Sequence, residues 1–149
     1  MKLNLEQIKI NEGTIEYQRY IGSYKNNQFY PYLCSEGFWT IGYGHRCLET
    51  QEPISVMTAD LLLLNDAKKA EQQALLIHKS LYDEVNQVLA EMVFQLGRSG
   101  VLKFKRFLAA LEVYDFKKAA HELKDSKYYR QTPNRVKLHI AKLEALNSK

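Results

Sequence analysis

The segment from Ser35 to His45 constrains the fold of this chain more than any other part of its sequence. It reads Ser-Glu-Gly-Phe-Trp-Thr-Ile-Gly-Tyr-Gly-His, in which a Gly-containing turn precedes alternating large and small side chains. Such a pattern is typical of a β-hairpin with a three-residue loop. If residues 35–37 form the loop, Cys34 faces Phe38 across the two strands. We predict a hairpin here, as the only sheet of the chain.

One face of this hairpin combines side chains that suit chemistry. Strict alternation places Thr40 diagonally on the same face as Cys34, so that a hydroxyl and a thiol share one surface. Gly42 and Gly44 continue that face without side chains, which lets a ligand approach the backbone closely. A small buried hydrophobic role for Cys34 and ordinary β-propensity for Thr40 are the alternative interpretations.

Helical signals with clear ends cover most of the remaining chain. Asn4 is a good N-cap, Gln7 stands at the capping-box position and Gly13 supplies the stop, which predicts a first helix over residues 4–12. Beyond Pro53, apolar residues keep the helical spacing almost to the end. The predicted helices there run from Ser55 or Thr58 to near His78, from about Tyr82 to Leu96 with Gly97 as the stop, from Asp115 to Lys124, and from Thr132-Pro133 to about Leu146.

These elements predict an α+β fold in a single domain over residues 1–149. A small sheet-bearing lobe is expected at about 13–54, a connecting helix at about 55–79 and a helical lobe at about 80–149, with helix 4–12 packing on the helical lobe. A chain of 149 residues buries enough surface for a stable core without disulfides. Cys34 and Cys47 are therefore expected to be free thiols.

Charge is distributed unevenly along the chain. Residues 101–149 contain 12 Lys or Arg and 5 Asp or Glu, whereas residues 1–100 contain 9 and 12. A basic half favours an anionic partner such as nucleic acid, a membrane surface or the acidic polymers of a cell wall, and a Lys-rich helical surface explains it equally well. The sequence shows no transmembrane run and no cleavable signal, so we expect a cytoplasmic chain without stable membrane insertion.

Glu12 is the main candidate for acid catalysis. It is the last residue of the first predicted helix, where the negative end of the helix dipole disfavours a carboxylate, so we expect a raised pKa. Cleavage of a glycosidic bond needs a group that keeps its proton near neutral pH and donates it to the leaving oxygen. A solvated carboxylate at a helix end is the alternative.

Two other kinds of site fit the residues less well. A pair of Cys34 and His45 would suggest a cysteine peptidase or amidase, but alternation places His45 on the opposite face with Trp39. Cys34, His45 and Cys47 do not have the spacing of a compact zinc motif, so no metal is expected.

A group of aromatic, amide and guanidinium side chains in the helical half suits sugar binding. Its members are Phe94, Gln95, Tyr128, Gln131, Asn134 and Arg135. Each has a plain structural alternative as a core, capping or surface residue.

Four blocks of the sequence together carry a family resemblance. They are residues 10–13 (Ile-Asn-Glu-Gly), residues 36–45 (Glu-Gly-Phe-Trp-Thr-Ile-Gly-Tyr-Gly-His), residues 92–97 (Met-Val-Phe-Gln-Leu-Gly) and residues 128–135 (Tyr-Tyr-Arg-Gln-Thr-Pro-Asn-Arg). In this order the chain resembles the phage-type lysozymes, or endolysins, of glycoside hydrolase family 24, especially those of the T-even phage type. The resemblance implies a small hairpin lobe, a long connecting helix and a helical lobe, with a glycan cleft between the lobes.

The resemblance also assigns roles to particular residues. It implies that Glu12 is the general acid, that Cys34 stands where most members have Asp, and that Thr40 positions water. It further implies a pairing of Arg135 with Glu12 and a structural ion pair between His45 and Asp66. The residues expected at or beside the cleft, as substrate-binding positions, are Glu36, Phe94, Gln95 and Tyr128, with Arg135.

The chain departs from the family pattern in two places. Twenty-one residues separate Glu12 from Cys34, more than the family usually has, which predicts an insertion around Tyr20–Phe29. The short interval between His45 and the long helix leaves little room for an additional strand and helix.

The expected function is hydrolysis of the β-1,4 bond between N-acetylmuramic acid and N-acetylglucosamine in peptidoglycan, without cofactor or metal, causing bacterial lysis. A lytic transglycosylase and a catalytically weak wall-binding module are the alternatives, and no motif supports a nucleic-acid binder. The expected partner is the glycan strand of peptidoglycan. The chain is expected to be a monomer that stays in the host cytoplasm until it reaches the wall with a holin-type permeabilising partner.

Overall fold

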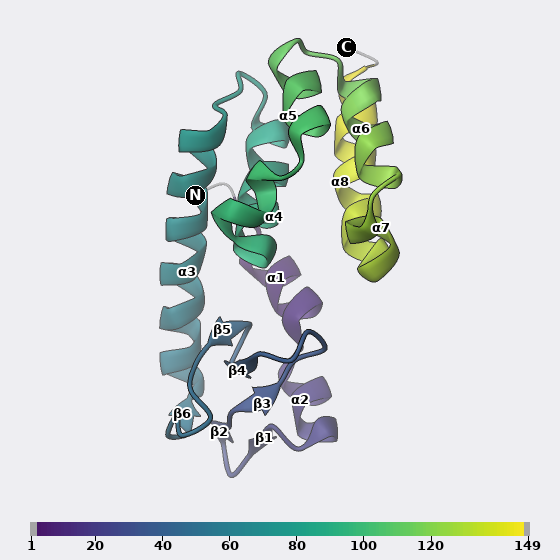
Figure 1. Cartoon of the computed structure of the whole chain (residues 1–149). Coiled ribbons are helices and arrows are strands. Elements are labelled where there is room, and N and C mark those ends of the chain that lie inside the picture. The colour runs from purple at the N-terminus through teal and green to yellow at the C-terminus, as the bar shows by residue number, and fades with distance from the viewer. Residues whose placement is uncertain (1–2, 148–149) are drawn as a thin grey trace. The chain divides into compact units, whose positions relative to one another are not determined.

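The computed structural model describes residues 3–147 and shows the predicted α+β fold (Figure 1). Short strands gather in the N-terminal part, and helices make up the rest. The helices are α1 (Leu5–Glu12), α2 (Ile15–Ile21), α3 (Val56–Ile77), α4 (Asp83–Leu102), α5 (Lys105–Glu112), α6 (Phe116–Lys124), α7 (Lys127–Gln131) and α8 (Pro133–Leu146). The strands are β1 (Tyr24–Lys25), β2 (Gln28–Phe29), β3 (Tyr32–Leu33), β4 (Trp39–Ile41), β5 (His45–Arg46) and β6 (Ile54–Ser55).

The predicted hairpin is formed by β3 and β4, and its register is the predicted one. Tyr32 pairs with Thr40, and the Cys34 amide donates to the Phe38 carbonyl over 2.9 Å. Strand β5 then pairs with β4 and completes a three-stranded antiparallel sheet. A left-handed backbone at Gly37, with φ of 84°, closes the loop, and this conformation costs glycine little.

The prediction of a single sheet was wrong. A second antiparallel sheet has the strand order β1-β2-β6. Its first hairpin turns at Asn26 and Asn27, whose φ angles of 54° and 59° are those of a type I′ turn. The interval between His45 and the long helix was expected to have little room for an additional strand, but strand β6 lies there. The sheet forms because residues 24–29 and 54–55 pair across a long sequence separation, which local patterns do not show.

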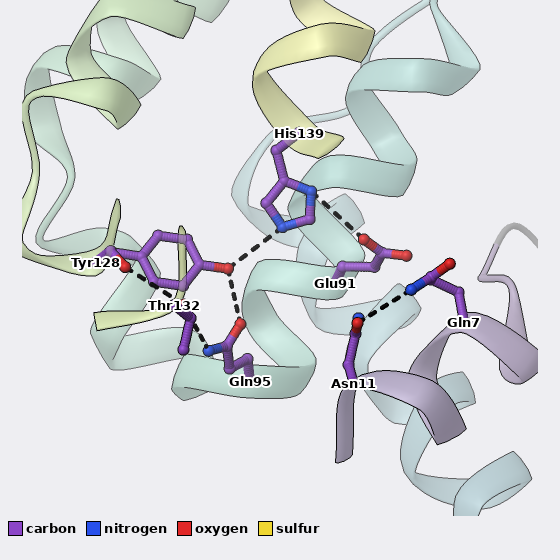
Figure 2. Close-up of polar contacts among 7 residues, drawn as sticks. All are labelled: Gln7, Asn11, Glu91, Gln95, Tyr128, Thr132 and His139. Atoms are coloured by element: carbon purple, nitrogen blue, oxygen red, sulfur yellow. Dashed lines mark hydrogen bonds and ion pairs between the residues drawn. The ribbon is translucent and has the colours of Figure 1, made fainter. Parts of the chain in front are cut away.

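The first two helices occupy the segment before these sheets. In α1 the Asn4 side chain accepts from the Gln7 amide and Gly13 follows Glu12, as predicted. The Gln7 side chain donates to Asn11 (Figure 2). Helix α2 was not predicted; Thr14 caps its start and a left-handed Gly22 caps its end. The residues between Glu12 and Cys34 thus form a helix and a hairpin.

The later helices follow their predicted ends closely. Helix α3 matches the expected connecting helix, and Asp115 caps α6 by accepting from the Lys118 amide. Helix α4 has a kink at Gly97, where φ is 76° and ψ is 164°, and helical structure resumes up to Leu102. The first helical segment of α4 therefore ends at Gly97, as predicted, and a second segment follows it. Along residues 3–147, no helix combines the length and the apolar character that a membrane crossing needs.

The chain divides into two compact units. Residues 4–68 form one unit, and the residues from 69 onward form the other, to which Leu3 also belongs. The first unit buries Ile8, Phe29, Ile41 and Leu63, while the second buries side chains from α4, α5, α6 and α8 such as Leu89, Met92, Phe107, Leu123 and Leu143. Helix α1 is thus grouped with the sheets, and its expected packing on the helical lobe stays a prediction.

Candidate active site

The Glu12 carboxyl lies directly against the turn between β4 and β5. Gly44 in this turn has a φ of 80°, and a Cβ atom placed on it would lie 2.8 Å from Glu12 Oε2. The backbone conformation therefore favours glycine at position 44, and the lack of a side chain there leaves space for the Glu12 carboxyl. The sequence signal that predicted a close approach at Gly44 is explained by the approach of Glu12 to the hairpin.

Tyr32 joins the end of α1 to the strand β3. Its hydroxyl donates to the Glu12 carbonyl over 3.4 Å, which serves one of the carbonyls left without a helical partner at the end of α1. Thr40 is the cross-strand partner of Tyr32, and Cys34 follows Tyr32 by two residues. Since side chains two apart share a face, Cys34 and Thr40 lie on the same face as the side chain that reaches Glu12.

Thr40 and Cys34 have defined polar partners. The Thr40 side chain is buried, and its hydroxyl donates to the Phe38 carbonyl over 3.1 Å. Because that carbonyl can only accept, the Thr40 oxygen keeps its lone pairs for another donor. The half-buried Cys34 thiol has its Sγ 4.0 Å from Glu36 Oε2, so the predicted residue Glu36 lies beside the thiol in the exposed hairpin loop.

Gln18 is the residue that sequence reasoning missed in this unit. Its side chain is fully buried, and its Nε2 donates to the carbonyls of Gly13 and Gly42 over 2.9 Å and 2.8 Å. Ser23 donates to the other end of the amide over 3.0 Å. One amide thus fixes the residue after Glu12 to the turn that contacts the Glu12 carboxyl. A single polar residue in an unpredicted helix gives no sequence signal for this role.

The predicted pair of His45 and Asp66 is confirmed. His45 Nδ1 lies 2.7 Å from Asp66 Oδ2, which joins β5 to α3 within the first unit. A second contact joins α1 to α3, because Lys9 Nζ lies 3.1 Å from Asp60 and also covers the Tyr43 ring. The Lys9 pKa is raised: burial lowers it, and the hydrogen bond and charge of Asp60 outweigh that effect. These contacts hold the β4–β5 turn against two helices.

The second unit brings Gln95 and Tyr128 together. The Tyr128 hydroxyl donates to Gln95 Oε1 over 2.8 Å, and Gln95 Nε2 donates to Thr132 Oγ1 over 3.3 Å (Figure 2). Tyr128 is buried, whereas Gln95 is half-buried and follows the half-buried Phe94 on α4. Of the predicted sugar-binding group, these two residues are thus in direct contact. The pairing of Arg135 with Glu12 stays a prediction.

Glu91 and His139 extend this cluster and were not singled out as a pair from the sequence. His139 Nε2 lies 3.3 Å from the Tyr128 hydroxyl and His139 Nδ1 lies 3.4 Å from Glu91 Oε2 (Figure 2). Burial lowers the pKa of His139 to about 4, with a further lowering by Lys142 and Arg135. Burial raises the pKa of Glu91, against the opposing charges of the same two cations.

Both cysteines are free thiols, as predicted. Burial raises the pKa of the Cys47 thiol. In the part of the chain that the structure describes, no three His, Cys, Asp or Glu side chains come together as a metal site would require.

A carboxyl held at a helix end against a glycine-rich hairpin, in an α+β chain, is suited to a glycoside hydrolase. Residues 23–139 match the family described as Phage lysozyme, so the chain belongs to the phage lysozyme family. It is therefore a lysozyme-type glycoside hydrolase that degrades peptidoglycan. The matched segment contains Cys34 and Thr40 and begins after Glu12.

Two curated relatives come from Dictyostelium discoideum. The protein named "Probable T4-type lysozyme 2" is 30% identical, with 76% of this chain and 84% of the relative covered. The protein named "Probable T4-type lysozyme 1" is 27% identical with the same coverage.

Proposed function

We propose that this chain is a muramidase, which hydrolyses the β-1,4 bond between N-acetylmuramic acid and N-acetylglucosamine and thereby lyses bacterial cells. The observation that carries the proposal is the contact between the Glu12 carboxyl and the backbone at Gly44. It fixes an acidic group beside the hairpin face that bears Cys34 and Thr40. Inverting glycoside hydrolysis needs an acid for the leaving oxygen and a base that activates a water.

Glu12 acts as the general acid in this proposal. Its carboxyl donates a proton to the glycosidic oxygen while the bond from that oxygen to the sugar C1 breaks. The carboxyl occupies the space that a side chain on residue 44 would take, and Tyr32 holds the backbone carbonyl of Glu12. The acid is thus held in position before substrate arrives, which lowers the cost of reaching the reactive geometry.

Thr40 and Cys34 handle the attacking water. The Thr40 hydroxyl uses its own proton on the Phe38 carbonyl, so its oxygen accepts a hydrogen bond from water and orients it. As the water oxygen bonds to C1, its proton passes to the Cys34 sulfur in thiolate form, and the Glu12 carboxylate left behind is later reprotonated from solvent. Before the attack, the neighbouring Glu36 carboxylate takes the Cys34 thiol proton along this contact, which forms the thiolate, and Glu36 later releases that proton to solvent.

The glycan strand is the proposed partner of the helical unit. Phe94 offers an aromatic surface and Gln95 an amide, and Arg135 adds a cation on α8. Residues 101–149 carry 12 Lys or Arg against 5 Asp or Glu, which favours approach to the anionic wall.

The test compares Glu12→Gln with Glu16→Gln on purified peptidoglycan. Both variants remove one carboxylate, but Glu16 is exposed on α2. We expect Glu12→Gln to keep the melting behaviour and lose nearly all release of reducing ends, because an amide cannot donate the proton. Glu16→Gln should match the unmodified chain. Retained hydrolysis by Glu12→Gln would remove Glu12 from the mechanism, and binding without hydrolysis by the unmodified chain would favour a wall-binding module.

A further inference from the structure

A continuous chain of polar side chains runs through the helical unit and ends at Gln95. It begins at Glu91 on α4, passes through His139 on α8 and Tyr128 on α7, and reaches Gln95 one turn beyond Glu91 on α4 (Figure 2). His139 is only 2% exposed and the Glu91 side chain 12% exposed. Buried polar groups of this kind are costly unless every donor meets an acceptor, so the position of each proton matters.

The far end of the chain fixes the direction of its hydrogen bonds. The Thr132 hydroxyl donates to the Tyr128 backbone carbonyl over 3.3 Å, so Thr132 Oγ1 accepts from Gln95 Nε2. The Gln95 amide therefore turns its Oε1 toward Tyr128, whose hydroxyl donates to it. Since that hydroxyl has only one proton, its oxygen accepts from His139 Nε2.

This direction leaves His139 Nδ1 without a proton in the neutral ring. Nδ1 is buried and makes no hydrogen bond of good geometry to any described residue, and the nearest polar group is Glu91 Oε2 at 3.4 Å. A bare nitrogen lone pair and an ionised carboxylate would repel each other there. A protonated Glu91 carboxyl, in contrast, donates to Nδ1 and completes the chain. Burial favours this neutral arrangement, because it raises the pKa of Glu91 and lowers that of His139.

The groups that face this pair come from three helices. Tyr128 of α7 and Glu91 of α4 contact the ring, and Lys142 and Arg135 of α8 act on it through their charge. The same two cations lower the pKa of Glu91, so they oppose the effect of burial there.

We propose that Glu91 and His139 share one proton and act as positioning residues, which set through Tyr128 the direction in which Gln95 presents its amide to the glycan. The glycan-binding role of Gln95 rests on the function proposed above. In the protonated state, the Gln95 amide is held by Tyr128 and Thr132 and keeps one Nε2 hydrogen for a ligand, since these are its only side-chain partners among the described residues.

Loss of the shared proton reverses the chain. An ionised Glu91 needs a donor, so the ring proton moves from Nε2 to Nδ1, and Nε2 becomes an acceptor. The Tyr128 hydroxyl then turns from Gln95 to His139, and Gln95 Oε1 loses the donor that holds it. Substrate binding at Gln95 weakens as the pH rises through the titration of Glu91, whereas the proton transfer by Glu12 uses none of these groups.

The first test reads the tautomer of His139 directly, by the nitrogen chemical shifts of its ring in the unliganded chain. As the pH rises above the His139 pKa of about 4, we expect a neutral ring that changes from the Nε2–H to the Nδ1–H form in one titration. In Glu91→Gln the new amide donates to Nδ1 at every pH, so the Nε2–H form should persist. The exposed Glu112→Gln is the matched control and should keep the switch. A single unchanging tautomer in the unmodified chain, which needs no variant to observe, would overturn the proposal, as would a switch that persists in Glu91→Gln.

The second test separates KM from kcat with soluble peptidoglycan fragments. Across the same titration, the KM of the unmodified chain should rise about fivefold, which is the effect of losing roughly one net hydrogen bond. The ratio of the kcat of Glu91→Gln to the kcat of the unmodified chain should stay constant with pH. Glu91→Gln should show no such rise in KM. A constant KM in the unmodified chain, despite a tautomer switch, would refute the link to Gln95. A tautomer switch in a chain that neither binds nor cleaves glycan would refute the proposed function and the role at Gln95 while supporting the shared proton.

Discussion

Replacement of Gly44 by Ala tests whether the contact between the hairpin and Glu12 matters for catalysis. Gly44 has a φ of 80°, so an alanine there should cost about 1 to 2 kcal/mol of folding free energy from its left-handed backbone. The new Cβ would also lie 2.8 Å from Glu12 Oε2 and 2.9 Å from Glu12 Cδ, which is too close. The flexible carboxyl will move aside at little cost in stability, but it will no longer lie where the acid is needed.

Gly22→Ala is the matched control for this variant. Gly22 has a similar φ of 87°, and a Cβ added there meets no atom within 4 Å. Urea unfolding should therefore show a similar loss of stability in both variants. Hydrolysis of purified peptidoglycan, measured well below both melting temperatures, should fall by about 100-fold in Gly44→Ala alone, since a misplacement of ~1 Å at a reacting group has effects of this size. Equal activity in the two variants would refute the argument that Gly44 positions Glu12.

Three further predictions concern other residues. Cys34→Ala should lose most activity, whereas Cys34→Asp should keep a substantial part with a more acidic pH optimum, because a carboxylate ionises at lower pH than a thiol. Full activity after alkylation of Cys34 in a Cys47→Ser background would show that the thiol is structural. Gln18→Leu should lower the unfolding free energy by about 2 to 4 kcal/mol, as two buried carbonyls lose their donor, and a change below about 0.5 kcal/mol in urea unfolding would contradict this. Because the pKa of His139 is lowered to about 4 in the folded chain, only the unfolded chain takes up this proton between about pH 6.5 and about pH 4. The free energy of unfolding should therefore decrease by up to about 3 kcal/mol as the pH falls through this range, and a urea midpoint that does not change with pH would contradict a buried neutral ring.

The features that the sequence predicted well depend on local patterns. The register of β3 and β4 follows from side-chain alternation around a Gly-containing loop, so the partnership of Cys34 with Phe38 could be read from a few neighbouring residues. Helix ends at Asn4, Gly13 and Asp115 were predictable because capping acts within one turn of the chain.

The features that the sequence did not show depend on contacts between distant segments. Strand β6 pairs with β2 across 25 residues from Phe29 to Ile54, and two-residue strands are too short to have a periodic pattern. Gln18 reaches Gly42 across 24 residues, and its burial follows only from the way α2 packs. Glu91 and His139 resemble surface residues in isolation, because their meeting depends on the packing of α4 against α8.

The central claim, that the chain is a muramidase with Glu12 as its acid, is tested most directly by mass spectrometry of the products from purified peptidoglycan. A muramidase adds water at the muramic acid C1, so the products should carry N-acetylmuramic acid at their reducing ends, and Glu12→Gln should yield almost none of them. Products that end in anhydromuramic acid would show a lytic transglycosylase, and reducing-end N-acetylglucosamine would show cleavage of the other bond. Either product, or muramic acid ends formed equally by Glu12→Gln, would contradict the account.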